Sequence, residues 1–259
     1  RAKLVTPSQG IHLVVDKKFF PGNYAMMIPK TADGRVFFAV PWLDKIVLGT
    51  TDTGVDTISE EPMALEEEIA FVMDHFNKYA AATIHRTDIL SVYAGLRPLV
   101  KVKGAASTAL LSRDHTLLIS DSGLVTITGG KWTTYRKMAQ DAIDNAIFSA
   151  KLVKKLPCCT KNLSIGNEEL KGERMKAIKC EGSCEEEAAI RYAVRYEMAI
   201  TVEDYLSRRT RLLLLDANTA INQCRYVATI MAKELGMNNQ WIEKQVESFN
   251  LLAQQYLVT

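Results

Sequence analysis

The spacing of the apolar residues changes near residue 130, and this change constrains the fold more than any other feature of the chain. Before it, short runs rich in β-branched and aromatic residues are separated by turn signals, beginning with Ile11–Asp16, Tyr24–Pro29, Arg35–Val40 and Lys45–Thr50. Such runs predict an antiparallel sheet. Beyond it, apolar residues recur every three or four positions, which predicts helices. We therefore expect an α+β fold, with an antiparallel sheet domain followed by an all-α helical domain.

Turn and breaker residues refine this division. Pro62 predicts the start of a helix within the sheet region. Pro157, Gly166 and many lysines mark residues 151–172 as a linker. The expected domains are thus residues 1–150 with the sheet, the linker at 151–172 and a helical domain at 173–259. Turns of the sheet are predicted at Asp33-Gly34, around Pro41-Trp42 and at Asp121-Ser122-Gly123.

The composition excludes several classes of protein. The 259 residues carry a net charge of +2, without the concentrated basic face that nucleic-acid binding needs. No apolar run approaches the ~20 residues of a membrane-spanning helix. The chain begins with Arg1 and shows no signal-peptide core, so we expect a fragment or a processed product. Five cysteines favour reduced thiols, and Cys180-x3-Cys184 lacks the second half of a zinc site, so no metal is expected.

The first candidate for a ligand site is the glycine pair Gly129-Gly130. It follows an apolar strand and opens a helix, where backbone N–H groups and the helix dipole favour an anion. Lys131 adds a positive charge, and Thr133 and Thr134 add hydroxyl groups and a helix cap. A tight turn without a ligand is the alternative. The segment fits neither the Walker A pattern nor the G-x-G-x-x-G dinucleotide pattern.

Two arginines form the second candidate. Arg97 and Arg113 lie at the ends of apolar segments, where a charge is costly unless it meets an anion. The planar guanidinium binds phosphate or carboxylate through parallel hydrogen bonds. Pairing with a local acid such as Asp114 is the alternative for Arg113, and a buried structural role is the alternative for Arg97.

Histidine and hydroxyl residues give weaker signals. His12 is the one histidine inside a strongly apolar strand-like run, and a lone strand histidine is more often a core residue than a catalyst. His75 is expected to face solvent on its helix. Gly49-Thr50-Thr51-Asp52-Thr53 ends a strand, and turn capping is its preferred interpretation. Arg208-Arg209 is interpreted as a solvated helix face or an ion-pair network.

Several segments, in this order, resemble the FAD-dependent glycerol-3-phosphate dehydrogenase and glycerophosphate oxidase family. Five lie in the sheet region and on the glycine loop, and Val202–Thr210 resembles the C-terminal helical domain of that family. The five are Thr6–Val14, Leu48–Thr53, Ala94–Leu99, Ser112–Thr116 and Gly129–Arg136. The resemblance implies that residues 1–150 are the substrate-binding part of the FAD-dependent oxidoreductase domain, without the dinucleotide-binding region.

The same resemblance implies roles for individual residues. It places His12, Arg97, Arg113 and Lys131 around sn-glycerol 3-phosphate, with Arg113 at the phosphate and Arg97 near the phosphate or the hydroxyls. His12 or Lys131 would be the catalytic base, and the flavin would contact Gly129, Gly130, Lys131, Trp132, Thr133 and Thr134. The implied reaction moves a hydride from C2 to flavin N5 and gives dihydroxyacetone phosphate.

The resemblance also implies partners, and two alternative functions stay open. Electrons would pass to a quinone, or to oxygen in an oxidase. We expect FAD in the full-length enzyme, and expect this part alone to lack both the cofactor and activity. A cytoplasmic location is expected, while a peripheral contact with the inner face of the cell membrane and a homodimer stay open. The rivals are a non-catalytic interaction or scaffold module and a related flavoprotein oxidase acting on an amine or a hydroxy acid.

Overall fold

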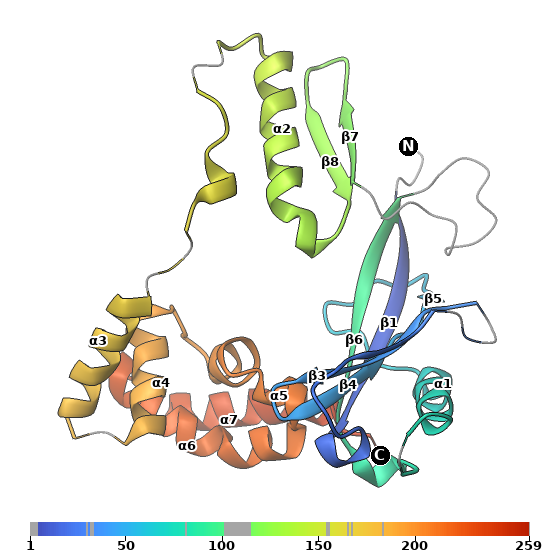
Figure 1. Ribbon diagram of the computed structural model, residues 1–259. Coiled ribbons are helices and arrows are strands. Elements are labelled where there is room, and N and C mark those ends of the chain that lie inside the picture. The colour runs from blue at the N-terminus through green and yellow to red at the C-terminus, as the bar shows by residue number, and fades with distance from the viewer. Residues whose placement is uncertain are drawn as a thin grey trace. The chain divides into compact units, whose positions relative to one another are not determined.

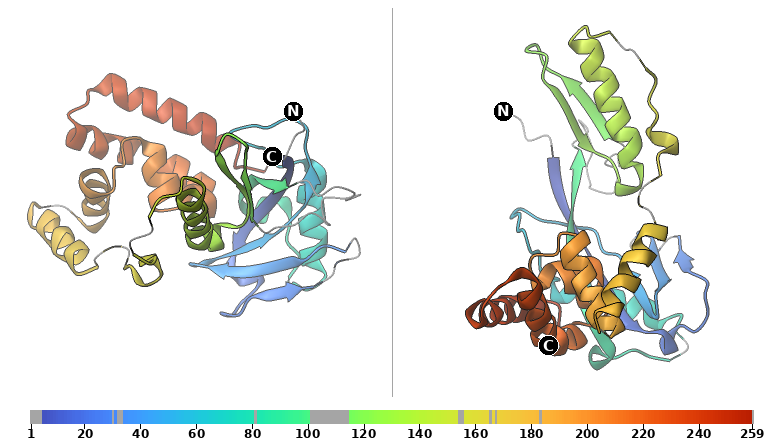
Figure 2. Two further views of the ribbon diagram at one scale, coloured as in Figure 1. Left: turned by 90° about the horizontal axis from the view of Figure 1, so that it is seen from above. Right: turned by 90° about the vertical axis from the view of Figure 1, so that its left-hand side faces the viewer.

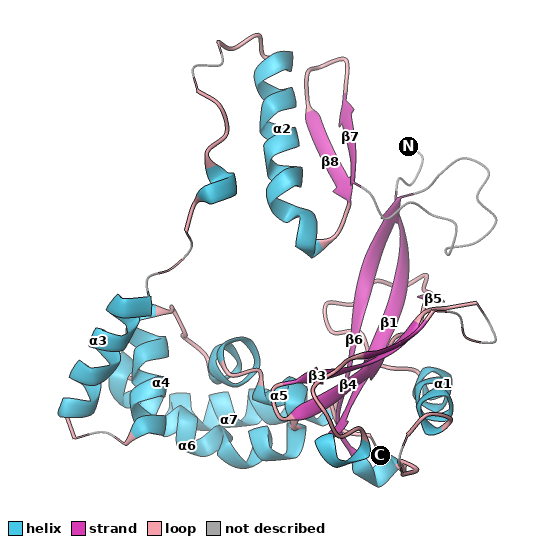
Figure 3. Cartoon of the chain, viewed as in Figure 1, coloured by secondary structure: helices cyan, strands magenta, loops and turns pink. Residues whose placement is uncertain are grey.

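The computed structural model describes residues 5–258 except 30, 32–33, 81, 101–114, 154–155, 165, 167 and 183. The chain forms two compact units (Figures 1 and 3). Unit 1 contains residues 1–9, 52–60 and 95–166, and unit 2 contains residues 10–51, 61–94 and 167–259. None of the described helices is long and apolar enough to cross a membrane.

An antiparallel sheet is built on the long strand β1. Its strands follow the spatial order β2-β3-β4-β1-β5, and β6 also pairs with β1. The predicted meander of neighbouring strands is confirmed, although β1 and β6 are longer than the sequence pattern indicated. The strands are β1 (Val5–Asp16), β2 (Met26–Ile28), β3 (Phe37–Trp42), β4 (Lys45–Gly49), β5 (Thr53–Gly54) and β6 (Ile89–Val100).

One face of this sheet in unit 2 packs against the helix α1 (Glu66–Asn77). Alternate residues of a strand point to opposite faces, so the strands contribute every second apolar side chain to the core. Burying a side chain of this size contributes roughly 1.5–3 kcal/mol. The core includes Ile11, Leu13, Val15, Phe37 and Leu48 of the strands and Ile69, Val72 and Phe76 of α1.

Helices make up the rest of unit 2, as the 3.6-residue period predicted. α6 and α7 pack against each other (Figure 2) and share an apolar core with the segments before them. Asp216 and Asn238 accept hydrogen bonds at the first turns of α6 and α7, and Gly236 ends α6 with a φ of 68°. The helices are α3 (Glu168–Cys180), α4 (Glu185–Tyr196), α5 (Leu212–Leu215), α6 (Ala217–Leu235) and α7 (Asn239–Gln254).

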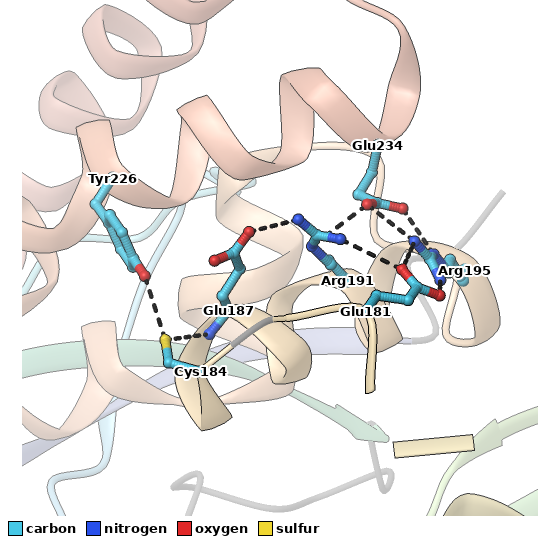
Figure 4. A network of polar contacts seen from close by, with 7 residues as sticks. All are labelled: Glu181, Cys184, Glu187, Arg191, Arg195, Tyr226 and Glu234. Carbon is cyan, nitrogen blue, oxygen red and sulfur yellow. Dashed lines mark hydrogen bonds and ion pairs between the residues drawn. The ribbon is translucent and has the colours of Figure 1, made fainter. Parts of the chain in front are cut away.

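Two arginines of α4 connect the α3–α4 turn to α6 (Figure 4). Arg195 donates from Nε to Glu234 Oε2 at 2.7 Å and from Nη1 to Glu181 Oε1 at 2.9 Å. Arg191, one turn earlier, donates to Glu187 Oε1 at 2.6 Å, and its Nε lies 3.5 Å from Glu234. Because both arginines reach Glu234, the end of α6 is joined to α4 by charge-assisted bonds as well as by apolar packing.

Unit 1 contains a β-hairpin and a helix. The strands β7 (His115–Ile119) and β8 (Val125–Gly129) pair antiparallel, and α2 (Tyr135–Ser149) lies beside them (Figure 1). The predicted hairpin turn is confirmed, because Gly123 donates to the Ser120 carbonyl at 2.8 Å and adopts a φ of 84°. Glycine adopts this left-handed conformation without a steric penalty.

Several local predictions were wrong. β3 continues through Pro41 and Trp42, and the turn follows at Leu43 and Asp44. The pairing of β3 with β2 ends at Ala39, so Pro41 lies where the strand has one neighbour and a missing N–H is tolerated. Helix α1 begins at Glu66 rather than at Pro62, and α3 begins at Glu168, inside the predicted linker.

The expected solvent exposure of His75 was also wrong. Its Nδ1 lies 2.8 Å from the Phe71 carbonyl, and its Nε2 is buried without a hydrogen-bond partner. The ring packs 4.0 Å from the Phe71 ring and 6.3 Å from the Phe37 ring, measured between centroids. One aromatic neighbour on α1 and one on the sheet therefore partly cover a side chain that helical spacing alone had placed outward.

Candidate functional site

Unit 1 contains a cavity of about 350 Å³ between the end of β6 and the loop from β8 to α2. Its walls are Leu96, Arg97, Pro98 and Leu99 on one side and Gly129, Gly130, Lys131 and Trp132 on the other. Small-molecule sites occupy roughly 300–1,000 Å³, so this volume suits a small ligand or part of a larger one. The structure thus brings the predicted arginine segment and the predicted glycine loop to one cavity.

The loop needs glycine at both of its first positions. Gly129 and Gly130 have φ values of 75° and 81°, in the left-handed region that costs other residues roughly 1–2 kcal/mol. A Cβ on Gly130 would also lie 2.5 Å from Met138 Sδ and 3.2 Å from His115 Cβ. The pair therefore lets the backbone turn sharply between the end of β8 and the start of α2.

The residues after the glycines combine a turn with exposed side chains. Thr134 Oγ1 donates to the Lys131 carbonyl at 2.9 Å and accepts from Lys131 N at 3.4 Å, which closes a short turn. Lys131 and Thr133 are exposed. Trp132 is 86% exposed and stacks on Tyr135 with ring centroids 5.5 Å apart. Thr134 thus closes the turn at Lys131 but makes no side-chain capping bond to α2, while Lys131 and Trp132 are exposed.

Arg97 contributes a positive charge to the opposite wall. Its Nη1 lies 3.9 Å from Asp52 Oδ1, and the side chains of Arg97 and Asp52 are 28% and 15% exposed. Asp52 also accepts a short hydrogen bond from the Ser8 hydroxyl. Asp52 belongs to the Gly49–Thr53 segment, so this motif supplies an acid that orients the arginine. Arg113 lies outside the described residues.

His12 lies on β1 in unit 2, where its ring packs against two aromatic rings. It stacks on Tyr93 with centroids 5.3 Å apart and lies 5.7 Å from the Phe38 ring. Burial raises the pKa of Tyr93 to about 12, so its hydroxyl stays protonated in neutral solution. Gly49 is opposite His12 in the β1–β4 register, and a Cβ there would lie 2.5 Å from His12 Cδ2. The absence of a side chain at Gly49 makes room for the imidazole.

A buried polar link lies beside this strand pair. Thr51 Oγ1 accepts from Ile11 N at 3.1 Å and donates to Glu68 Oε1 at 2.7 Å. Glu68 Oε2 in turn accepts from Leu65 N at 3.1 Å, at the start of α1. Glu68 is only 2% exposed. The Thr51 hydroxyl therefore joins the sheet to α1, which agrees with a structural interpretation of the Gly49–Thr53 motif.

Sequence reasoning also missed the residues that brace the glycine loop. His115 pairs with Gly129 across β7 and β8, and its Nε2 lies 3.1 Å from Asp141 Oδ2 on α2. Lys137, one turn before Asp141, donates to Oδ1 at 2.6 Å. Lys137 and then His115 hold the pKa of Asp141 below its usual range. The Lys137-x3-Asp141 spacing was the available signal, because side chains four apart on a helix are neighbours.

The similarity of this chain to known proteins extends along nearly its whole length. The family model of the C-terminal domain of alpha-glycerophosphate oxidase matches residues 169–242. A mitochondrial glycerol-3-phosphate dehydrogenase of Arabidopsis thaliana is 32% identical over 99% of this chain and 48% of its own length. This chain is a relative of the glycerol-3-phosphate dehydrogenases. The family resemblance predicted from the ordered motifs is therefore confirmed.

Other glycerol-3-phosphate dehydrogenases support the same relation. The mitochondrial enzyme of Homo sapiens is 31% identical over 95% of this chain and 40% of its own length. The chain thus spans about half the length of the curated relatives, or less. A crystal structure of the Bacillus halodurans enzyme complexed with FAD has a TM-score of 0.75 at 24% identity, covering 98% of this chain and 58% of that one. This likeness confirms the expected α+β fold.

Proposed function

We propose that this chain forms the substrate side of an FAD-dependent enzyme that oxidises sn-glycerol 3-phosphate to dihydroxyacetone phosphate. The observation that carries the proposal is the cavity of unit 1, which joins Arg97 to the Gly129–Trp132 loop. The relatives are about twice as long as this chain, so the activity is proposed for a protein that also contains the remaining part. The electron acceptor is proposed to be a quinone, reached from the cytoplasmic face of the cell membrane.

The charges of the cavity suit an anionic substrate. Arg97 and Lys131 contribute positive charge from opposite walls, and the described residues that line the cavity include no acid. A guanidinium that is already oriented loses little entropy when it binds a phosphate or a hydroxyl oxygen. Two cations around one small cavity favour a phosphorylated substrate over an amine.

The loop residues also fit a flavin ring. The volume is too small for a whole dinucleotide and suits the reactive end of one together with a small substrate. The glycine pair turns the backbone sharply after β8, and the turn brings Lys131 and Trp132 to the wall of the cavity. Lys131 would stabilise negative charge that develops along the ring edge. FAD, when bound, supplies the hydride acceptor for C2 of the substrate.

The chain's own residues would handle the proton of the C2 hydroxyl. Lys131 borders the cavity, and His12 is a fixed imidazole on β1. Either group, in its neutral form, is able to accept the proton while the C2 hydrogen leaves as hydride. The Lys131 side chain is exposed, whereas the His12 ring packs against two aromatic neighbours. Substitution of each residue in turn, with the pH profile of turnover as the readout, identifies the base.

Substrate choice tests the proposal directly. In the full-length protein, anaerobic addition of glycerol 3-phosphate is expected to bleach the absorbance of oxidised flavin, and dihydroxyacetone phosphate is expected to accumulate. Glycerol, sarcosine, glycine and 2-hydroxyglutarate serve as controls and are expected to leave the spectrum unchanged. Bleaching by sarcosine or 2-hydroxyglutarate alone would show a different flavoprotein oxidase, and no bleaching by any compound would favour a non-catalytic module.

Arg97→Gln is expected to raise the KM for glycerol 3-phosphate by roughly 10- to 100-fold, because one charge-assisted hydrogen bond is worth about 1.5–3 kcal/mol. The matched control is Arg86→Gln, which removes an arginine that is paired with Glu66 and does not line the cavity, and it is expected to leave KM unchanged. Steady-state kinetics of the full-length protein measure both. An Arg97→Gln variant that loses thermal stability but keeps its KM would show that Arg97 only supports Asp52.

A further inference from the structure

A second cavity of unit 1 lies between α2 and the segment that follows it. It measures about 270 Å³ and is lined by α2 between Ala139 and Ile147 and by Leu156–Thr160. Two adjacent cysteines, Cys158 and Cys159, form part of its wall, and both are exposed. The cavity therefore presents neighbouring thiols to small molecules in solvent.

Polar contacts hold one of these thiols in a fixed place. Cys158 Sγ lies 3.1 Å from Thr160 Oγ1 and 4.0 Å from Arg136 Nη1. The same Nη1 donates to Thr160 Oγ1 at 3.2 Å and to Gln140 Oε1 at 2.9 Å. Because Thr160 and Gln140 orient the guanidinium, its positive charge stays close to the sulfur.

These contacts favour the thiolate of Cys158. The hydrogen bond from the Thr160 hydroxyl is the largest influence lowering the pKa of the Cys158 thiol, and the Arg136 charge lowers it further, against the negative charge of Asp144. The thiolate is the nucleophilic form of cysteine. One cation and one anion near the sulfur, with apolar walls at Ile143 and Leu156, suit an uncharged reactant.

We propose that Cys158 and Cys159 form a redox-active dithiol, in which Cys158 attacks a small uncharged disulfide bound in this cavity and Cys159 completes the exchange. The inference is independent of the proposed dehydrogenase function, because it uses neither Arg97 nor the glycine loop.

The exchange balances in two steps. The Cys158 thiolate attacks one sulfur of the small disulfide, so a mixed disulfide forms and one small thiolate leaves. Cys159 then loses its proton to solvent and attacks Cys158 Sγ, which releases the second small thiolate and forms a bond between the two cysteine sulfurs. The pair of protein thiols is oxidised, and the small disulfide is reduced to two thiols.

Reaction of the whole 259-residue chain with 2-hydroxyethyl disulfide near neutral pH tests the proposal. Mass spectrometry of quenched samples follows each cysteine over time. Cys158 is expected to react several-fold faster than Cys180 and Cys184, which are also exposed and serve as internal controls. The end product is expected to be a peptide lighter by two hydrogen atoms, with Cys158 bonded to Cys159. Equal rates at Cys158 and Cys180 would overturn the proposal.

Variants separate the roles of the two cysteines. In Cys159→Ser the mixed disulfide on Cys158 is expected to accumulate, whereas in Cys158→Ser the reaction is expected to slow to the rate of Cys180. Thr160→Val removes the hydroxyl from Cys158 and is expected to slow its reaction several-fold while Cys180 is unaffected. A mixed disulfide that persists in the unmodified chain would rule out Cys159 as the resolving thiol. Far-ultraviolet circular dichroism confirms that each variant is folded.

Discussion

Gly49→Ala is expected to lower the free energy of unfolding by about 1–3 kcal/mol, the range of overpacked core positions. The new Cβ would lie 2.5 Å from His12 Cδ2 and 3.1 Å from the Ile11 carbonyl oxygen. The His12 ring has little room to move away, because it stacks on Tyr93 and lies against the tilted Phe38 ring. Denaturant unfolding measures the loss. In the full-length protein, the displaced imidazole is also expected to reduce turnover if His12 serves the proposed site.

Two further variants give this prediction its controls. Gly54→Ala places a methyl group where no atom lies within 4 Å, and its effect is expected to stay within about 0.5 kcal/mol. Adding His12→Ala to Gly49→Ala is expected to recover most of the stability lost through the methyl group, because the clashing ring is gone. Strictly additive effects would contradict the steric explanation through His12 and would point to the Ile11 carbonyl instead.

Arg195→Met is expected to destabilise the helical part of unit 2 by about 2 kcal/mol, because it leaves the partly buried Glu234 without this partner. Arg195 makes two hydrogen bonds to each of Glu181 and Glu234, with donor–acceptor distances from 2.7 to 3.1 Å. The Glu234 side chain is only 12% exposed. Methionine keeps much of the aliphatic packing, so the loss of stability measures the effect of removing the positive charge and its hydrogen bonds. Thermal unfolding followed by circular dichroism measures it.

A matched arginine on the same domain serves as the control. Arg225 forms a similar paired contact with Glu243 at 2.6 and 2.7 Å, but its side chain is 59% exposed and that of Glu243 is 63% exposed. Arg225→Met is therefore expected to change the unfolding temperature much less than Arg195→Met. Equal losses in unfolding temperature would show that the position of Arg195 between two helices does not increase its contribution to stability.

Lowering the pH is expected to narrow the difference in unfolding temperature between Arg195→Met and the unmodified chain. Arg195 holds the pKa of Glu181 below its ordinary value of 4.5. A carboxylate with a lowered folded-state pKa contributes stability that is present above the unfolded pKa and is lost as the pH falls through the folded one. Repeating the melts from neutral pH down to below 4.5 is expected to show the two unfolding temperatures converging.

The helical region was predictable from the sequence because its apolar residues follow one regular period. The stripe through Ala220, Cys224, Val227 and Met231 is buried in α6, and Gly236 ends that helix as expected. The ordered motifs also identified the family. Both results rest on local signals, each of which is contained in a short segment of the chain.

The candidate site was less predictable because its contacts cross long sequence separations. The two walls of the cavity, with Arg97 and Lys131, match two predicted segments, yet the pairing of Arg97 with Asp52 depends on which strand ends meet. The room for His12 depends on a glycine 37 positions later, opposite it in the register of β1 and β4. The partial burial of His75 depends on Phe71 of its own helix and on Phe37 of the sheet, and helical spacing alone does not reveal either contact.

Unit 2 is built from parts of the chain that lie far apart in the sequence, and this has a consequence for when it folds during synthesis on the ribosome. The strands of residues 10–51 and 61–94 share this unit with residues 167–259. Ser91 Oγ donates to the Leu213 carbonyl at 2.9 Å, and Val92 N donates to the Tyr256 carbonyl at 2.9 Å. At about 5–20 residues per second, roughly 6 to 33 seconds of synthesis separate these partners. During that interval the nascent sheet lacks the helices that complete its unit, so folding of unit 2 can finish only after Tyr256 has left the exit tunnel.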